Sequence, residues 1–192
     1  MSLKSQSLGT VSSAARGILI TSGTNATPIV ATITAGHRQR NGSRIAIAGV
    51  TTLTAMNGEW SLSSVGATTG TLDGSAGNGA FGGTATVAVV CDRSPHLAKH
   101  SGVVLIGQPS GAVFVGTAVI EYADSVDATQ FYYTNSSGVA TAGFTSALLS
   151  GEIAIPAATA GQAVAVEVRM ARFMTFRCSA YTSGVAGADI LA

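Results

Sequence analysis

The sequence of 192 residues is poor in charge, aromatic rings, proline and cysteine. Charged residues make up 10% of the chain and aromatic residues 6%, so the long charged faces of exposed helices are missing. The ten Lys and Arg residues are balanced by nine Asp and Glu residues, and they form no run interleaved with aromatic rings. The usual electrostatic and stacking signals of nucleic-acid binding are therefore lacking, and we expect no nucleic-acid partner.

Long apolar runs are lacking as well, although the mean hydropathy is +0.42. The longest uncharged apolar runs, such as residues 111–120, have about half the length of a membrane-spanning helix, so we expect no membrane partner. The first ten residues lack the basic and apolar regions of a secretory signal, which predicts synthesis and assembly in the cytoplasm. Cys91 and Cys178 are then expected to be reduced thiols.

Small and β-branched residues are abundant instead, and 24 glycines accompany short alternating apolar stretches, a composition that favours strands and turns. Asn41-Gly42, Asn57-Gly58 and Asp73-Gly74 are dipeptides typical of tight turns. The expected strands are 29–33, 44–47, 60–63, 71–72, 84–90, 113–122, 163–170, 173–181 and 187–191. The sequence predicts an all-β protein in which a small β-domain precedes an antiparallel β-sandwich, with a jelly roll as one form of that sandwich.

Three segments are expected along the chain: an extended N-terminal arm at 1–17, a small β-domain around Trp60 at 18–84, and the antiparallel β-sandwich at 85–192. Residues 1–84 carry five basic against two acidic side chains, a net charge of +3, whereas residues 85–192 carry five against seven, a net charge of −2. The arm is small and polar, so burial of its own side chains is not expected to hold it in place. We therefore expect it to lie against neighbouring subunits in an assembly.

The candidate partner-contact residues are basic. Lys4 and Arg16 lie in the arm, and Arg38, Arg40 and Arg44 surround the Asn41-Gly42 turn. A solvated loop is the simple interpretation of these three arginines. The alternative is that they meet an acidic surface of a partner, because guanidinium groups bind carboxylates bidentately.

No catalytic, cofactor or metal site is expected from the remaining patterns. Gly77, Gly79 and Gly82 match the spacing of a dinucleotide-binding loop, but the strand expected at 84–90 stands where that motif needs a helix. A short helix expected at 94–100 would place His96 and His100 near Cys91, yet a fourth metal ligand is missing. Asp124 and Asp127 lie in a segment typical of a hairpin tip. We expect a protein that is not an enzyme.

Residues 24–83 resemble a module that recurs in structural proteins of tailed bacteriophages. Four sub-motifs carry the resemblance in order: an N-A-T-P-I-V strand at 25–30, I-x-G-V at 47–50, N-G-x-W at 57–60, and L-D-G-S-x-G-N-G-A-F at 72–81. The G-H-R-Q-R-N-G segment at 36–42 departs from the pattern, in which a His-Gly turn and an acidic residue are more usual. A looser likeness to β-sandwich domains of phage head and tail proteins lies at 115–121 and 176–184.

The resemblance implies a virion structural protein without giving its place in the virion. Among virion proteins the chain resembles capsid decoration, or cement, proteins best, because it is short, has an N-terminal arm expected to be ordered, and lacks the long repeats of tail fibres. Its expected partner is then the major capsid protein, its expected oligomer a homotrimer, and its expected location the capsid exterior. The alternative is a host-recognition module of a head fibre or tail, with a carbohydrate site at Tyr132 and Tyr133.

Overall fold

The three-dimensional structure is a computed structural model that describes residues 5–12, 17–91, 101–107, 114–123, 125–126, 131–134, 140–142, 145–146, 153–154, 163–169 and 172–191. In these ranges every regular element is a β-strand, apart from the single 3-10 turn η1 (Thr54–Met56). The prediction of an all-β protein is therefore confirmed.

The strands, in chain order, are β1 (Ser5–Val11), β2 (Ile20–Gly23), β3 (Ile29–Ile33), β4 (Arg44–Val50), β5 (Gly58–Ser63), β6 (Thr69–Leu72), β7 (Gly83–Val90), β8 (Ser101–Gly107), β9 (Val115–Ala123), β10 (Ser125–Val126), β11 (Phe131–Thr134), β12 (Ala140–Ala142), β13 (Thr145–Ser146), β14 (Ile153–Ala154), β15 (Ala163–Arg169), β16 (Phe173–Ser183) and β17 (Ala186–Leu191).

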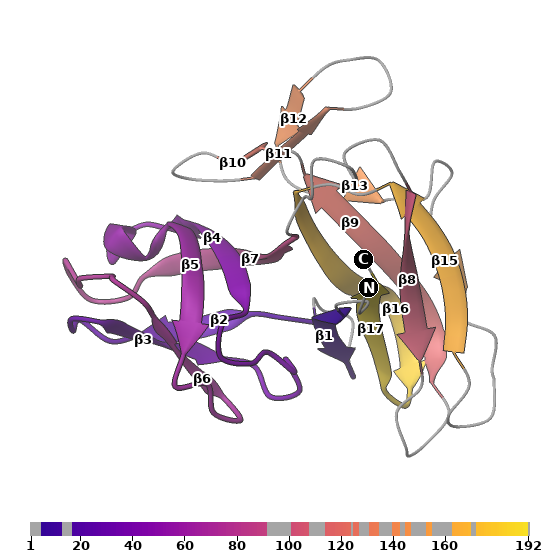
Figure 1. Ribbon diagram of the computed structural model, residues 1–192, viewed down its shortest axis with the longest axis horizontal. Helices are drawn as coiled ribbons and strands as arrows, with labels where there is room; N and C mark the ends of the chain where they lie inside the picture. The colour runs from indigo at the N-terminus through magenta and orange to yellow at the C-terminus, as the bar shows by residue number, and fades with distance from the viewer. Residues whose placement is uncertain are drawn as a thin grey trace.

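Two lobes lie side by side in Figure 1. The first lobe contains β2 to β7, whose strand order is β2-β3-β6-β5-β4-β7, and β2 lies close to β7, so the sheet curls back on itself. The second lobe contains β1, β8, β9 and β13 to β17. A small antiparallel sheet of β10, β11 and β12 stands above the two lobes in this view.

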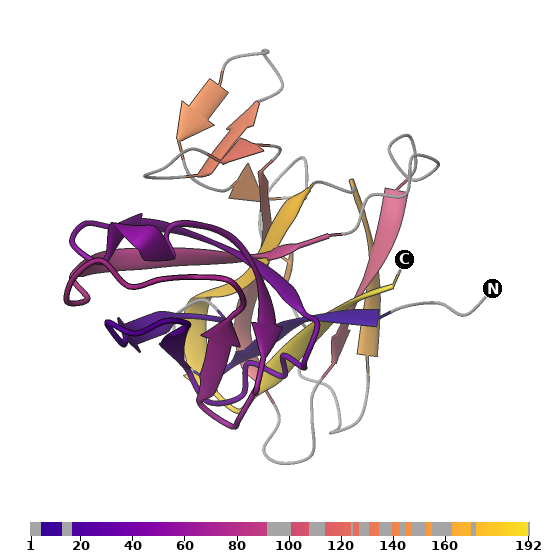
Figure 2. The same ribbon diagram turned by 60° about the vertical axis from the view of Figure 1, so that its left-hand side comes forward.

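The second lobe has two layers, as Figures 1 and 2 show. One layer is the sheet β1-β17-β8-β15, and the other is formed mainly by β9 and β16. All pairings in both layers are antiparallel. Side chains from β1, β16 and β17 meet between the layers in the hydrophobic core, which is the arrangement of a β-sandwich.

One continuous sheet joins the lobes. β7 pairs with β4 of the first lobe through five residue pairs, from Ile45↔Val89 to Val50↔Gly83, and with β16 of the second lobe at Phe173↔Val90 and Met174↔Val89. A further backbone bond runs from the Cys91 N–H to the carbonyl of Arg172, at 2.8 Å. The boundary expected between residues 84 and 85 therefore falls inside a strand that belongs to both lobes.

Alternation of side chains explains why the first-lobe strands form. In β3 the residues Ile29, Ala31 and Ile33 are buried, whereas the residues between them are half-buried. In β4 both faces are buried, with Ile45 and Ile47 on one face and alanines on the other. Large side chains thus fill the inside of the curled sheet, and small ones occupy its outer face.

The larger of two hydrophobic clusters among the described residues extends through both lobes, and the smaller one lies on the other face of β4 and β7. The larger cluster is centred in the first lobe on isoleucines and in the second on phenylalanine, methionine and alanine. Its fully buried members include Ile29, Ile45, Ile47, Leu72, Phe114, Met174, Phe176, Ala188 and Ile190. Trp60 packs only partly buried against this core, so it is a margin residue and not the centre that the sequence suggests.

The N-terminal segment requires a correction. β1 pairs with β17 of its own chain from Ser5↔Leu191 to Val11↔Ala186, and Leu8 and Val11 are buried at 0% and 2% exposure. The expectation that this segment lacks burial of its own is therefore wrong for residues 5–11. Two apolar side chains and one strand edge hold it, which the small-residue composition conceals.

Candidate partner-contact surface

The loop at residues 34–43, between β3 and β4, carries two of the predicted basic residues and connects the lobes. Its buried residue Gln39 donates from Nε2 to the carbonyl of Ser7 in β1 at 2.9 Å. Gly36 accepts from both the backbone N–H (3.2 Å) and the hydroxyl (2.9 Å) of Thr10, also in β1. The loop is thus fixed to the N-terminal strand rather than free in solvent.

His37 is a buried residue that fixes the same loop through hydrogen bonds. Its exposure is 3%, its Nδ1 accepts from the backbone N–H of Gln39 at 2.9 Å, and its Nε2 lies 3.1 Å from the carbonyl of Gly66. Since Nδ1 must accept, the proton of the neutral ring belongs on Nε2, which donates to Gly66. This imidazole is used to hold backbone and has no remaining donor or acceptor for a ligand.

Arg38 points at the second lobe. Its Nη2 lies 2.9 Å from Oδ2 of Asp189 in β17. Its φ of 55° lies in the left-handed region, which costs a residue with a side chain about 1 kcal/mol. Of the predicted contact residues, this arginine is therefore engaged within its own chain, as a link between the lobes.

Arg44 takes part in a triad with Glu59 and Arg172. One carboxylate oxygen of Glu59 lies 3.0 Å from Nη2 of Arg44, and the other lies 2.6 Å from Nη2 of Arg172. The guanidinium of Arg172 also lies over the ring of Phe173, 5.3 Å from its centroid. Because Arg172 immediately precedes β16, the triad joins β4 and β5 of the first lobe to the second.

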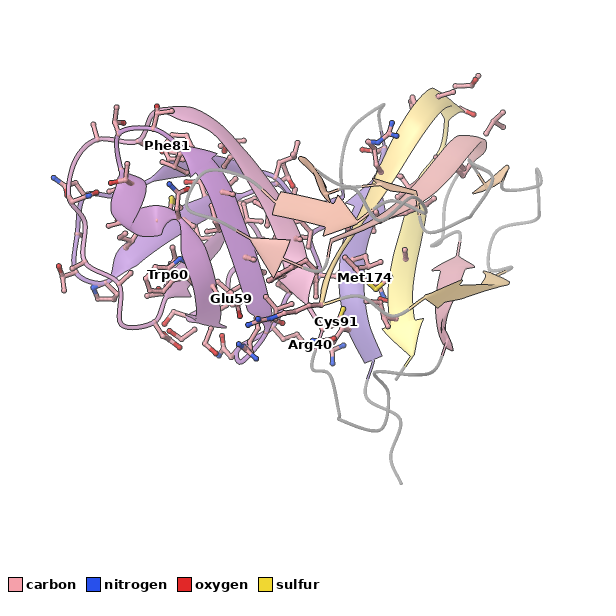
Figure 3. The ribbon with its side chains drawn as sticks, turned by 90° about the horizontal axis from the view of Figure 1, so that it is seen from above. Arg40, Glu59, Trp60, Phe81, Cys91 and Met174 are labelled. Atoms are coloured by element: carbon pink, nitrogen blue, oxygen red, sulfur yellow. The ribbon has the colours of Figure 1, made fainter. Side chains whose placement is uncertain are left out.

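Arg40 lies four residues before Arg44 of this triad, in the turn that leads into β4. It is exposed, it opens the turn in which the Ser43 N–H donates to its carbonyl at 2.9 Å, and its own N–H donates to the Ser43 hydroxyl. Figure 3 shows Arg40 and Glu59 on the same side of the molecule, near the junction of the lobes. We call Arg40, Arg44, Glu59 and Arg172 the arginine ledge.

Sequence reasoning found only part of the ledge. Arg40 and Arg44 were predicted, Lys4 and Arg16 lie outside the described residues, and Glu59 and Arg172 were missed. Arg172 is more than 100 residues from Glu59, and their contact depends on the pairing of β7 with β16. Nothing in the local pattern of either residue could have indicated it.

The four sub-motifs at 25–81 meet in one hydrogen-bond network at the loop end of the first lobe. Asn25 Oδ1 accepts from the Gly79 N–H at 3.2 Å, and Asn57 bonds both backbone groups of Val50 at 3.0 and 2.8 Å. Asn78 holds η1 through the Ala55 N–H at 3.1 Å. These asparagines close loops, so the motifs describe how this lobe folds.

The glycine-rich run 77–82 lies in the loop between β6 and β7, as its strand context predicts. A Cβ on Gly77 would lie 2.4 Å from Oδ1 of Asn25, and one on Gly82 would lie 2.7 Å from the hydroxyl of Thr52. Loop packing therefore explains the glycines, and β7 follows them where a dinucleotide site would need a helix.

The thiols lie apart. Cys91 and Cys178 are both buried thiols that take part in no disulfide. Since Cys91 pairs beside Arg172, six residues before Cys178, the two sulfurs are separated by about 20 Å of extended strand, too far for a disulfide. His96, His100, Asp124 and Asp127 lie outside the described residues, among which no group of three metal-binding side chains occurs. The expected helix at 94–100 also lies outside them.

Tyr132 and Tyr133 lie in β11, where the described backbone pairs with β12. In the described part of the chain, no helix has the length and apolar character needed to cross a membrane. Comparisons with protein-family models, with curated proteins and with solved structures find no match to this chain.

Proposed function

We propose that this chain is a structural protein of a tailed-bacteriophage virion that decorates the capsid exterior and stabilises it by bridging major capsid protein subunits. It acts by binding rather than by catalysis, needs no cofactor, and assembles from the host cytoplasm as a homotrimer. The proposal originates in the four sub-motifs at 25–81.

The observation that carries the proposal furthest is the joint between the lobes. A bridging protein under tension must transmit force between its own contact surfaces, and a rigid joint does so with less extension than a flexible linker. Here one sheet crosses both lobes through β7, and one hydrophobic core is shared by them. Polar contacts from Gln39 and Arg38 add to this joint from a second side.

The sub-motif network supports the same proposal in a different way. Four short sequence patterns spread over 57 residues, from 25 to 81, converge on one set of mutually bonded loops. Their order in the chain is therefore explained by one structural unit, which is what a recurrent module of virion proteins would require.

The test is copy number in purified virions, measured by quantitative mass spectrometry against the major capsid protein. We expect hundreds of copies, present in fixed ratio to the capsid lattice, whereas a handful of copies would contradict the proposal. Virions made without this chain should lose DNA at a lower temperature, and added purified protein should restore the wild-type temperature. Sedimentation of the purified protein tests the trimer.

A further inference from the structure

Arg40 and Arg172, two members of the arginine ledge, have guanidinium N–H donors that no described residue accepts. Arg172 has a side chain that is 49% exposed and bonds Glu59 through Nη2 alone among its nitrogens. Arg40 is exposed, and its guanidinium makes no ion pair with any residue that the structure describes. A guanidinium carries five N–H donors in a fixed fork, so most donors of these two residues remain available.

Glu59 arranges the ledge in advance of binding. Its carboxylate is the least exposed member, at 21%, and each oxygen holds one arginine, Arg44 at 3.0 Å and Arg172 at 2.6 Å. The Phe173 ring supports the Arg172 guanidinium from one face. Side chains already fixed in position lose less conformational entropy when a ligand binds, which raises affinity for a ligand of matching shape.

The charge of the ledge identifies the ligand class. Three arginines against one glutamate give a local charge of +2, in a chain whose total is only +1. Planar guanidinium forks match the geometry of carboxylates. A nucleic acid is less well matched, because the surrounding chain has too little positive charge to attract an extended polyanion.

We infer that the arginine ledge is a docking surface for an acidic segment of a partner protein, whose carboxylates bind Arg40 and Arg172 beside the triad. The inference rests on the proposed function only in taking that partner to be the major capsid protein. Because the ledge joins β4 and β5 to the start of β16, an acidic segment seated there contacts both lobes at once.

The test uses the full ¹⁵N-labelled protein and a peptide of eight glutamates at low salt. We expect the side-chain Nε–Hε signals of Arg40 and Arg172 to shift on titration, and that of Arg38 to stay in place. The double variant R40Q/R172Q should weaken binding at least tenfold. R38Q is the charge control for Arg40, since it removes one positive charge from the same loop, and it should change binding less than twofold, whereas R40Q alone should weaken binding more than R38Q does; equal losses in these two single variants would overturn the inference.

Two further measurements distinguish a pre-organised binding site from non-specific electrostatic attraction. Glu59→Ala raises the local charge from +2 to +3 but removes the residue that positions two arginines. We expect weaker binding of the glutamate peptide, whereas tighter binding would overturn the inference. Thymidine octanucleotide is the second probe, and if it shifts the same arginines at equal or lower concentration, the ledge is a nucleic-acid surface and the inference is wrong.

Measurements on purified virions distinguish a failure of this inference from a failure of the proposed function. If the chain is abundant on capsids and the R40Q/R172Q variant occupies them as fully as the wild type, the inference that the ledge is a docking surface is overturned and the proposed function stands. If the chain is missing from virions while the ledge binds the glutamate peptide with the expected variant pattern, the docking surface stands and the proposed function fails.

Discussion

The two lobes achieve their closure by different means. In the first lobe all strands come from one stretch of chain, 20–90, and side-chain amides and hydroxyls close its loops. In the second lobe the sheet β1-β17-β8-β15 joins the first strand of the chain to the last. The first lobe is thus built from contacts within one segment, whereas the second depends on pairing between residues more than 170 positions apart.

This difference indicates that β1 is the strand of the second lobe that detaches most easily. β1 is an edge strand with one pairing partner, two buried side chains and hydrogen bonds to the 34–43 loop, and it is easier to remove than a strand inside a curled sheet. Deleting residues 1–17 would therefore test the folding of the second lobe as well as any contact with neighbouring subunits. Point variants that preserve the chain length separate these effects better.

The largest effect is expected from Gly9→Ala. Gly9 has a φ of +88° at the bulge of β1, and an added Cβ would lie 2.4 Å from the carbonyl oxygen of Gly17. The left-handed backbone and the overlap together should lower the free energy of unfolding by about 3 kcal/mol. Urea denaturation measures this, and hydrogen exchange should locate the loss in β1 and β17.

Gly42→Ala is the matched control in the first lobe. Its φ of +84° is nearly the same, but apart from its two chain neighbours no described residue has a heavy atom within 4 Å of the added Cβ. Only the backbone strain remains, so we expect a loss of roughly 1 kcal/mol. Equal losses in the two variants would show that the close approach of Gly9 to Gly17 has no energetic consequence.

A second contrast concerns two buried hydroxyls. Ser75 in the first lobe is 2% exposed, accepts from the Ile29 N–H at 2.9 Å and donates to the Leu72 carbonyl at 2.6 Å. Thr175 in β16 is 1% exposed, and its hydroxyl has no hydrogen-bond partner among the residues that the structure describes. The first hydroxyl satisfies backbone groups, whereas the second carries an uncompensated desolvation cost.

The two substitutions should therefore have opposite signs. Ser75→Ala leaves the Ile29 N–H unpaired and should destabilise by about 1–2 kcal/mol, whereas the nearly isosteric Thr175→Val should stabilise by about 1 kcal/mol. Thermal unfolding of both variants beside the wild type is the measurement. A destabilised Thr175→Val protein would mean that this hydroxyl is satisfied after all.

The same contrast explains what the sequence could predict. β3 was predicted at its observed bounds, and Gly42, Gly58 and Gly74 in the three turn dipeptides all have positive φ. Such features depend on a few adjacent residues, as alternation and turn chemistry do. The strands β1, β2, β8 and β10 to β14 were missed, and for β1 the reason is physical. It has few apolar side chains, and its partner β17 lies at the opposite end of the chain.

The candidate site also has features that local sequence predicts and features that only the tertiary structure determines. The turn at 40–43 and its arginines follow from local sequence, but Arg38 and Arg44 find their acidic partners through tertiary structure. Asp189 lies 151 residues from Arg38, so no spacing rule indicates that this arginine is used internally. Partner choice among surface charges is therefore the part of the site that sequence reasoning leaves open.

The smallest expected effect concerns the ion pair between Arg38 and Asp189, which links the two lobes. The Arg38 and Asp189 side chains are 46% and 29% exposed, so solvent screens most of their attraction. A double-mutant cycle of Arg38→Gln and Asp189→Asn should give a coupling of about 0.5 kcal/mol that shrinks in 1 M salt. A coupling that is several times larger and insensitive to salt would mean that this pair orients the lobes, so that the junction depends on charge as well as on the shared sheet and core.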